Sequence, residues 1–148
     1  MHTNLEVTIR PFVKADYLAA FALWSSVDGL GLNESDTEEA IAAFLDRNPG
    51  FCAVAVNSTG EIVGTVMCGH NGRNGYLQHL AVADKYRGQG IAKNLIDRAL
   101  QKLAEARIPR CNVFVYSDNL EGNAFWRKHG WSKPEAWHLL QKPLPTDI

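Results

Sequence analysis

The pattern of apolar and polar positions along the chain predicts short strands and helices. Apolar and polar residues alternate over 7–10, and Pro11 closes that stretch, as in a short strand. Leu18, Phe21 and Ala22 recur instead at the spacing of one helix face, which predicts a helix over 15–24. The same periodicities predict strands at 51–57, 61–68, 76–82, 111–116 and 137–140, and helices ending at 48–50 and covering 91–107 and 122–129.

The order of these elements predicts the fold class. One strand, two helices, three antiparallel strands, then helix, strand, helix and strand make an α/β (mixed α+β) protein. We expect a central mixed, mostly antiparallel sheet of about six to seven strands with helices on both faces. The S-x-x-E form of Ser35 and Glu38 predicts a capping box at the start of the second helix. No linker or repeat is visible, so residues 1–148 are expected to form a single domain.

Composition and cysteine content favour a cytoplasmic protein. The chain has 148 residues, 46% of them apolar, and its apolar runs are far shorter than the roughly 18 to 20 residues that span a bilayer. Residues 1–4 open no charged and apolar leader. Cys52, Cys68 and Cys111 form no C-x-x-C pair and lie in apolar stretches, which is typical of reduced core thiols.

Charge is distributed unevenly although the formal net charge is only −1. Residues 1–74 carry four Lys/Arg and nine Asp/Glu, a net of −5, whereas residues 75–148 carry eleven and seven, a net of +4. The near-neutral total argues against a general nucleic-acid binder. If the halves form opposite sides of a cleft, one side suits an anionic ligand and the other a cationic one; otherwise these are solvated surface charges.

A glycine-rich turn joins the strand ending at Val82 to the helix that starts near Ile91. Its glycines let the backbone turn with no side chain between it and a ligand, and the helix offers unpaired N–H groups. This combination suits a pyrophosphate, although a loop that only turns the chain has the same composition. The dinucleotide fingerprint G-x-G-x-x-G is incomplete at Lys93, and the chain has no G-x-x-x-x-G-K-[ST] loop, so ATP and NAD lose their main support.

Two motifs resemble those of one enzyme family. Arg87-x-x-Gly90-x-Ala92 resembles the R/Q-x-x-G-x-G/A acyl-CoA signature of the GNAT acetyltransferase superfamily, within a strand, loop and helix block at 80–92. Residues 119–131 resemble its N-x-x-A-x-x-F-Y-x-x-x-G-F block, with Gly122 where alanine is usual. The resemblance covers about residues 5–142 and looks most like small bacterial members of the RimI and YpeA kind. It implies a GNAT-like acyl-CoA N-acyltransferase fold and an N-acetyltransferase that uses acetyl-CoA.

The resemblance also implies which residues contact acetyl-CoA. Backbone groups of the strand end, at Leu80, Ala81 and Val82, would meet the pantetheine arm and the thioester carbonyl. The pyrophosphate would lie among Arg87, Gly88, Gln89, Gly90, Ile91, Ala92 and Lys93, mostly against their N–H groups. In the second motif the corresponding residues are Asn119 and Asn123, beside the pantetheine arm, and Phe125 and Trp126, which would line its channel.

One departure from the family pattern concerns the leaving group. Trp126 stands where the family usually has the tyrosine thought to protonate the departing thiolate, and an indole N–H has no useful acidity near neutral pH. Another group or water would then act, or the thiolate would leave unaided, since a thiol of pKa about 8.5 is a fair leaving group. Tyr116 could substitute, but it also fits a core or rim position.

The acceptor amine must lose a proton, so a base or a water chain is expected beside it. Strand alternation predicts that Tyr76 and Gln78 share a face with Leu80 and Val82, while His79 points the other way. Gln78 cannot titrate, which leaves Tyr76 as a candidate base and a water relay as the alternative. His79 has a suitable side chain, but unless the strand bulges it is expected to be a packing or capping residue.

Acceptor contacts are expected from the loop at 27–36. Helix capping explains most of its acidic and hydroxyl groups, which leaves Asp28 and Glu34, together with Gln78 of the strand, as candidates to contact the substrate. The acidity of the loop would favour a cationic amine. His70 and Arg73 could reach the acceptor, although a plain hairpin turn explains them equally well.

These features predict an acetyl-CoA-dependent N-acetyltransferase that moves the acetyl group to a primary amine directly in a ternary complex. A covalent acyl-cysteine is not expected, because no cysteine lies in either motif. Two alternatives stay open: a non-catalytic acyl-CoA-binding or regulatory module, and a protein N-terminal or lysine acetyltransferase. The expected partner is a small-molecule or peptide amine, without metal, nucleic acid or membrane, and the protein is expected to be a monomer or homodimer.

Overall fold

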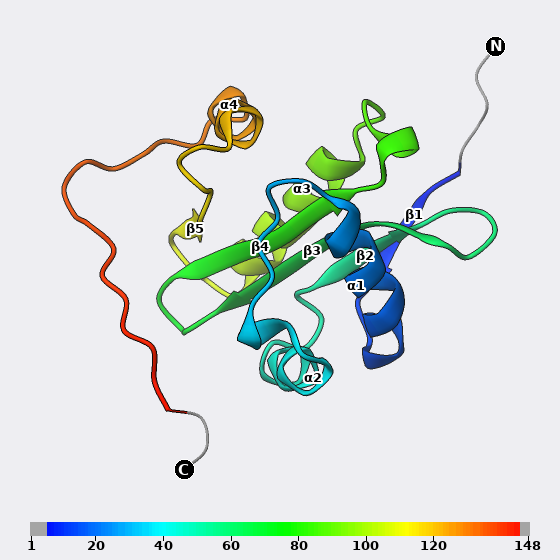
Figure 1. Ribbon diagram of the computed structural model, residues 1–148, viewed down its shortest axis with the longest axis horizontal. Coiled ribbons are helices and arrows are strands. Elements are labelled where there is room, and N and C mark those ends of the chain that lie inside the picture. The colour runs from blue at the N-terminus through cyan, green and yellow to red at the C-terminus, as the bar shows by residue number, and fades with distance from the viewer. Residues whose placement is uncertain (1–5, 146–148) are drawn as a thin grey trace. The chain divides into compact units, whose positions relative to one another are not determined.

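The computed structural model describes residues 6–145 and contains one five-stranded sheet in the order β1-β2-β3-β4-β5 (Figure 1). Its strands are β1 (Thr8–Pro11), β2 (Ala53–Val56), β3 (Ile62–His70), β4 (Gly75–Val82) and β5 (Cys111–Val113). Neighbours from β1 to β4 are antiparallel, and β5 is parallel to β4. The mixed, mostly antiparallel sheet predicted from the sequence is therefore confirmed.

Helices cover both faces of this sheet. α1 (Tyr17–Ser26) and α2 (Glu38–Arg47) lie on one face and α3 (Ile91–Glu105) on the other (Figure 1). Two glycines of β3 mark the two sides, because a Cβ at Gly64 would lie 3.2 Å from Ile91 of α3, and one at Gly69 would lie 2.6 Å from Phe44 of α2. Short 3-10 turns precede the three helices: η1 (Lys14–Asp16), η2 (Glu34–Asp36) and η3 (Asp84–Tyr86).

The chain divides into two compact units after Phe114. The first holds the sheet and α1 to α3, and the second holds α4 (Leu120–Lys128) and residues without regular structure. The strand predicted at 137–140 is wrong: within 6–145 this segment pairs with nothing, and Trp137, Leu139 and Leu140 are 61%, 63% and 89% exposed. An apolar alternation forms a strand only where a neighbour takes its hydrogen bonds. The described sheet therefore has five strands and not six or seven.

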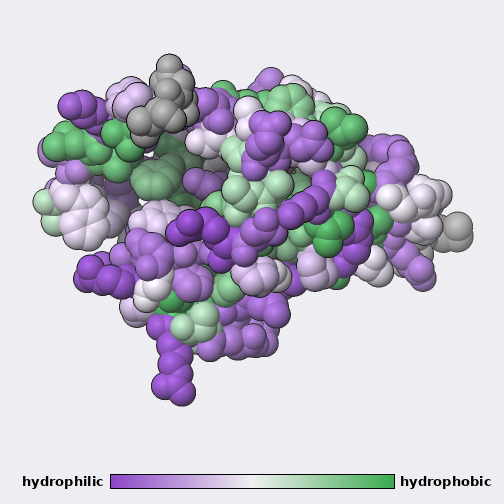
Figure 2. Space-filling model, turned by 90° about the horizontal axis from the view of Figure 1, so that it is seen from below, coloured by the Kyte–Doolittle hydropathy of each residue, from purple (hydrophilic) through white to green (hydrophobic). Residues whose placement is uncertain are grey.

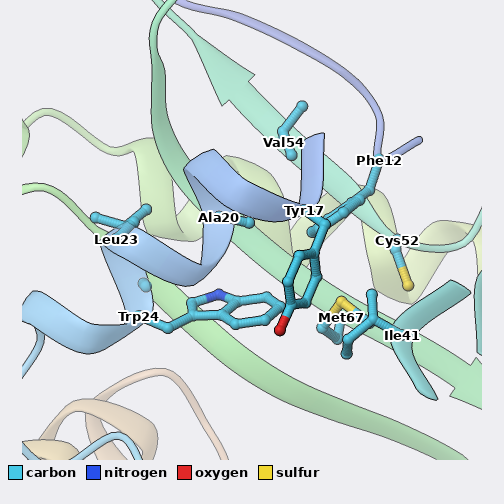
Figure 3. Close-up of a cluster of buried hydrophobic side chains, with 10 residues drawn as sticks. Phe12, Tyr17, Ala20, Leu23, Trp24, Ile41, Cys52, Val54 and Met67 are labelled. Atoms are coloured by element: carbon cyan, nitrogen blue, oxygen red, sulfur yellow. The ribbon is translucent and has the colours of Figure 1, made fainter. Parts of the chain in front are cut away.

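The core between α1, α2 and the sheet is a cluster of large side chains. Figure 3 shows Tyr17 and Trp24 reaching from α1 toward the sheet, close to Met67. Trp24 is fully buried, its ring centroid lies 6.2 Å from that of Phe12, and its Nε1 donates a 2.9 Å hydrogen bond to Thr65 Oγ1 of β3. The other members of the cluster are Ala20, Leu23, Ile41, Cys52, Val54 and Ala81. This packing holds α1 in a fixed position over β3 and β4.

The second helix begins later than its sequence motif suggests. Its N-cap is Thr37, whose Oγ1 accepts a 3.1 Å hydrogen bond from the Ala40 N–H. The residues before it form η2, in which Asp36 Oδ2 accepts from the Asn33 N–H at 2.9 Å. The capping box expected at Ser35 and Glu38 is therefore wrong, because a separate 3-10 turn takes up that segment.

An ion pair joins β1 to η1. The Arg10 guanidinium donates to both carboxylate oxygens of Asp16, at 2.8 and 2.9 Å, and the Val13 N–H donates to the same carboxylate at 2.9 Å. Burial raises the pKa of Asp16, but these hydrogen bonds outweigh burial and hold the pKa below its ordinary value of 3.8. A carboxyl group with a depressed folded-state pKa stabilises the fold above its unfolded pKa and ceases to do so as the pH falls through its folded pKa.

We expect Asp16→Asn to lower the free energy of unfolding by about 1 kcal/mol at pH 7, a modest value because the Arg10 side chain is 43% exposed and solvent screens the pair. Urea unfolding at several pH values should show the difference from wild type disappearing as the pH drops below 3.8. Asp46→Asn is the matched control, since Asp46 pairs with Lys14 while both side chains are more than half exposed. A difference that persists at low pH would contradict this account.

None of the helices within residues 6–145 is long and apolar enough to cross a bilayer. On the face drawn in Figure 2, hydrophilic residues predominate and hydrophobic ones form small separate patches.

Candidate functional site

The edge of β4 that faces β5 is only partly paired. β5 pairs with β4 through Gly75, Tyr76 and Leu77 alone, whereas β4 continues to Val82 along β3. From Gln78 onward, no strand among residues 6–145 takes the hydrogen bonds on that side. Main-chain groups at the end of β4 are therefore available to a ligand, apart from the His79 and Val82 carbonyls, which accept from Thr65 Oγ1 and Arg87 Nε.

A β-bulge lies in the same part of β4. Thr65 pairs with Ala81 but Met67 pairs with Gln78, so a single β3 residue faces both His79 and Leu80. His79 has a φ of 51°, in the left-handed region, and its carbonyl accepts a 2.8 Å hydrogen bond from Thr65 Oγ1. The extra residue breaks the side-chain alternation along β4.

The predicted alternation of side chains on β4 is therefore wrong beyond Gln78. Gln78 pairs with Met67, which belongs to the core under α1 and α2. Val82 instead pairs with Gly64, where an added Cβ would meet Ile91 of α3. Gln78 and Val82 thus lie on opposite faces, although an unbroken strand would place them on the same one.

His79 points toward α1 and η2. Its ring centroid lies 4.6 Å from that of Trp24, and its Nε2 lies 2.6 Å from Asp36 Oδ1. The His79 side chain is 15% exposed and that of Asp36 7%. The expectation that His79 points away from the face of Gln78 is corrected by this contact. Sequence reasoning also missed Asp36, which it treated as a helix cap, and nothing in the sequence marks the bulge that brings the two together.

The turn between β4 and α3 has the features of an anion site. Gly88 and Gly90 have φ values of 77° and 82°, and Gly90 is the N-cap of α3. The first helical hydrogen bond runs from the Asn94 N–H to the Gly90 carbonyl, and among the described residues nothing accepts from the N–H groups of 88–93. A Cβ on Gly88 or Gly90 would meet no atom within 4 Å, so the space above these amides is open. Free amides at a helix N-terminus attract anions.

Charged side chains flank this turn. Arg87 donates from Nε to the Val82 carbonyl at 3.3 Å and lies 3.2 Å from Asp84, while Lys93 pairs with Asp97 at 2.7 Å. All four charged side chains are more than half exposed, so these pairs are weak and either cation can turn to a ligand. The predicted cofactor residues of the first unit lie on one segment that runs from the end of β4 through the turn to the start of α3. They are Leu80, Ala81, Val82, Arg87, Gly88, Gln89, Gly90, Ile91, Ala92 and Lys93.

The remaining cofactor candidates lie in the second unit, around α4. Asn119 Oδ1 caps the helix by accepting from the Gly122 N–H at 2.9 Å, and Asn123 Nδ2 donates to the Tyr116 and Asn119 carbonyls. A Cβ at Gly122 would lie 2.5 Å from Asn119 Nδ2, which explains glycine at this position. The two asparagines therefore hold the local turn, and Asn119 Nδ2 has no partner among the described residues.

Aromatic residues of α4 pack on each other. Trp126 is buried, and its ring lies 4.9 Å from Trp131 and 5.3 Å from Phe125. Phe125 also contacts the His129 ring at 4.3 Å. Tyr116, considered as a replacement acid, is 60% exposed. Trp126 is thus a packing residue of this unit.

The acceptor candidates occupy exposed or half-buried positions in the first unit. Tyr76 is half-buried and stacks on Phe114 with a centroid distance of 6.2 Å, and Gln78 is exposed. Asp28 follows α1 and Glu34 opens η2, both exposed. His70 Nδ1 accepts from the Gly72 N–H at 2.9 Å. Its place in that turn supports the hairpin explanation for this histidine.

The cysteines are unsuited to nucleophilic catalysis. Burial raises the pKa of Cys52 and Cys111 to about 11 and that of Cys68 to about 12, so all three are protonated thiols near neutral pH. Cys52 Sγ also donates to the Cys68 carbonyl at 3.3 Å. No group of three or more His, Cys, Asp or Glu side chains within 6–145 is arranged to hold a metal ion.

Comparison with known proteins identifies the family of this chain. The model of the acetyltransferase (GNAT) family matches residues 17–131. An acetyltransferase of Sodalis glossinidius is 34% identical over 139 residues, which cover 94% of this chain and 96% of that protein. Another of Pectobacterium atrosepticum is 38% identical over 111 residues, 75% of this chain and 77% of that protein.

Solved structures share the fold at lower identity. A GNAT-family acetyltransferase of Staphylococcus aureus has a TM-score of 0.76 at 17% identity, covering 93% of this chain and 95% of its own. A Mycobacterium tuberculosis protein in complex with CoA has a TM-score of 0.70 at 20% identity, covering 86% and 73%. The family match and the curated relatives show that this chain belongs to the acetyltransferase (GNAT) family.

Proposed function

We propose that this protein transfers an acetyl group from acetyl-CoA to a primary amine directly, in a ternary complex. One observation carries the proposal: from Gln78 onward no described strand pairs with the outer edge of β4, and after η3 the chain forms a turn whose amides at 88–93 have no acceptor among the described residues. Pantetheine carries amide groups that an open strand edge can pair with, and its pyrophosphate is the anion that such a turn suits. The CoA in the structural neighbour from Mycobacterium tuberculosis supports the same cofactor class.

In this proposal the chain acts by positioning and by backbone electrostatics. The main chain at Leu80 to Val82 pairs with the pantetheine arm and directs an N–H group at the thioester oxygen, where negative charge develops during attack. The amides of 88–93 and the Arg87 and Lys93 side chains hold the pyrophosphate. Both units would form one domain, which is supported by a family match that spans the division after Phe114.

Asn119, Asn123, Phe125 and Trp126 are proposed to line the pantetheine channel, with Asn119 Nδ2 as the available donor. Because Trp126 cannot give a proton to the thiolate, CoA leaves as the thiolate or takes its proton from water. Because Trp126 offers no acidic group to the leaving thiolate, a second candidate is a non-catalytic acyl-CoA-binding module.

Acceptor recognition is assigned to the exposed acidic residues Asp28 and Glu34 and to Gln78, with Tyr76 on the same side of the sheet as Gln78. Carboxylates favour a cationic amine, whether it belongs to a small molecule or to a peptide. Asp28 and Glu34 belong to the segment between α1 and α2, and Gln78 lies on the face of the sheet that these helices cover. We therefore propose that the acceptor binds on that side of the sheet.

A thermal-melt comparison tests the cofactor. Acetyl-CoA and CoA, but not NAD, should raise the melting temperature by about 5–10 °C at about 100 times Kd, since that saturation adds about 2.7 kcal/mol. Thioester cleavage over a panel of polyamines, amino sugars and peptide N-termini then separates the two candidates. Turnover on any amine supports the enzyme, whereas binding without turnover in the wild type, with turnover gained in Trp126→Tyr, supports the module. No shift with either CoA species would overturn both.

A further inference from the structure

We infer that His79 is the general base that deprotonates the acceptor amine, and that Asp36 orients it. This inference rests on the proposed function, because it assigns a catalytic residue to that reaction. His79 Nε2 lies 2.6 Å from Asp36 Oδ1 at the β4 bulge, where Asp36 is buried and His79 is only 15% exposed. The two residues are 43 positions apart in the sequence, so no local pattern indicates this contact.

The contact with Asp36 fixes which ring nitrogen is basic. A carboxylate at Asp36 can only accept, so we assign the proton of the neutral His79 ring to Nε2 and the lone pair to Nδ1. Among the described residues no hydrogen bond reaches Nδ1, and this nitrogen is not among the atoms buried without a partner. Nδ1 therefore keeps contact with solvent and is free to accept a proton from a substrate or from one bridging water.

The pair is held rigidly from several sides. Asp36 Oδ2 accepts from the Asn33 N–H at 2.9 Å, and its backbone carbonyl accepts from Tyr17 Oη at 2.6 Å. Thr65 Oγ1 donates to the His79 carbonyl at 2.8 Å and accepts from the buried Trp24 Nε1 at 2.9 Å. Such support fixes the imidazole within a narrow range of positions, which a catalytic base requires.

The electrostatic surroundings of His79 are acidic. On the two helical elements that its ring contacts, the titratable groups are Glu34 and Asp36 of η2 and Tyr17 of α1. Glu38 and Glu39 of α2 lie close enough to raise the pKa of Tyr17. Negative groups stabilise the imidazolium that forms when a base takes a proton. The same groups attract a cationic amine to this side of the sheet.

The location fits the proposed reaction. His79 directly precedes Leu80, the first residue whose main chain is assigned to the thioester, and the bulge turns its ring toward α1 and η2. A non-glycine residue with a φ of 51° is uncommon in a strand, and such positions concentrate at functional sites. The base and the open strand edge therefore lie within one short segment.

Acetyl transfer to the ammonium form of the acceptor releases one proton overall. His79 Nδ1 accepts one proton from the ammonium of the acceptor, and the neutral amine nitrogen forms a bond to the thioester carbon while the C=O electron pair moves to oxygen. The tetrahedral intermediate collapses, the C–S bond breaks and CoA leaves as the thiolate. The nitrogen releases its second proton to the thiolate, through water, and the imidazolium returns its proton to solvent, so the products are the acetamide, CoA thiol and one proton.

His79→Asn tests this role, because asparagine tolerates the left-handed backbone and cannot act as a base. On the amine of the panel with the highest turnover, kcat should fall by roughly 10²- to 10⁴-fold at pH 7. The deficit should shrink as the pH rises toward about 10, where a lysine-like ammonium loses its proton to water. The acetyl-CoA melting shift should stay at the wild-type value.

Two further variants accompany His79→Asn. Asp36→Asn should lower kcat by a smaller factor, and His138→Gln, at an exposed position, is the control with full activity.

A second variant separates base catalysis from a structural role. His79→Gly relaxes the backbone and removes the ring, so added imidazole should restore activity at least about tenfold. Full activity of His79→Asn would overturn the inference. So would a loss that is independent of pH, accompanied by a lost acetyl-CoA shift and not rescued by imidazole, since that pattern describes a structural residue. A wild type that binds no acetyl-CoA or acetylates no amine would instead refute the proposed function.

Discussion

Gly90→Glu should weaken acetyl-CoA binding by at least about 100-fold, or about 2.7 kcal/mol, while the domain stays folded. Gly90 is the N-cap of α3, and a side chain added there would enter open space above the free amides of the turn. That space is assigned to the pyrophosphate, so the new carboxylate would both fill it and repel the anion. Isothermal titration with acetyl-CoA measures the change.

Gly60→Glu is the matched control for this experiment. Gly60 also has a left-handed φ, 87° against 82° for Gly90, and a Cβ there would likewise meet no atom within 4 Å. Both substitutions should therefore lose a similar amount of stability, on the order of 1 kcal/mol, from the backbone alone. Gly60 lies in the turn between β2 and β3, which contacts Tyr86 through Asn57 but contributes none of the amides of 88–93. Equal acetyl-CoA affinity in the two variants would remove the pyrophosphate assignment.

Trp24→Ala should lower the free energy of unfolding by about 3–5 kcal/mol. The indole is fully buried in the core of Figure 3, where it packs on Phe12 and His79 and donates a hydrogen bond to Thr65. Truncation removes all of these contacts and leaves a large cavity between α1 and the sheet. Equilibrium unfolding in urea, followed by far-UV circular dichroism, gives the difference.

Leu18→Ala provides the comparison on the same helix, because Leu18 is 76% exposed. Its effect should be within about 0.5 kcal/mol of zero. Thr65→Val separates packing from hydrogen bonding: it keeps the volume but leaves the buried Trp24 N–H without an acceptor, at about 1–3 kcal/mol. A Trp24→Ala effect no larger than that of Leu18→Ala would show that the α1 packing is wrong.

The spacing of apolar residues predicted the helices that bury only one of their faces. The helix expected at 91–107 is α3, Ile91–Glu105, and its buried residues Leu95, Ile96, Ala99 and Leu103 follow the helical spacing. The helix expected at 122–129 is α4, Leu120–Lys128, with Asn119 as its cap. The glycine-rich turn was also predictable, because glycine alone adopts a left-handed backbone easily. Gly88 and Gly90 both have that backbone in the structure.

Features that depend on long-range pairing could not be predicted. Alternation places side chains only while the pleat is unbroken, and the bulge at His79 is decided by the register between β3 and β4, which no single strand encodes. Asp36 has the spacing of a helix cap, and only the folded chain brings it to His79. The alternation at 137–140 suggested a strand for which the described residues offer no partner.

The open edge of β4 has a consequence for the protein without cofactor. The outer edge of Gln78–Val82, which pairs with no strand among the described residues, can accept a strand from another molecule, as exposed sheet edges do in aggregation. A pantetheine arm bound along this edge would satisfy the same hydrogen bonds. The cofactor would then act as a guard against intermolecular association as well as a reactant, and a chain depleted of it would be the aggregation-prone form.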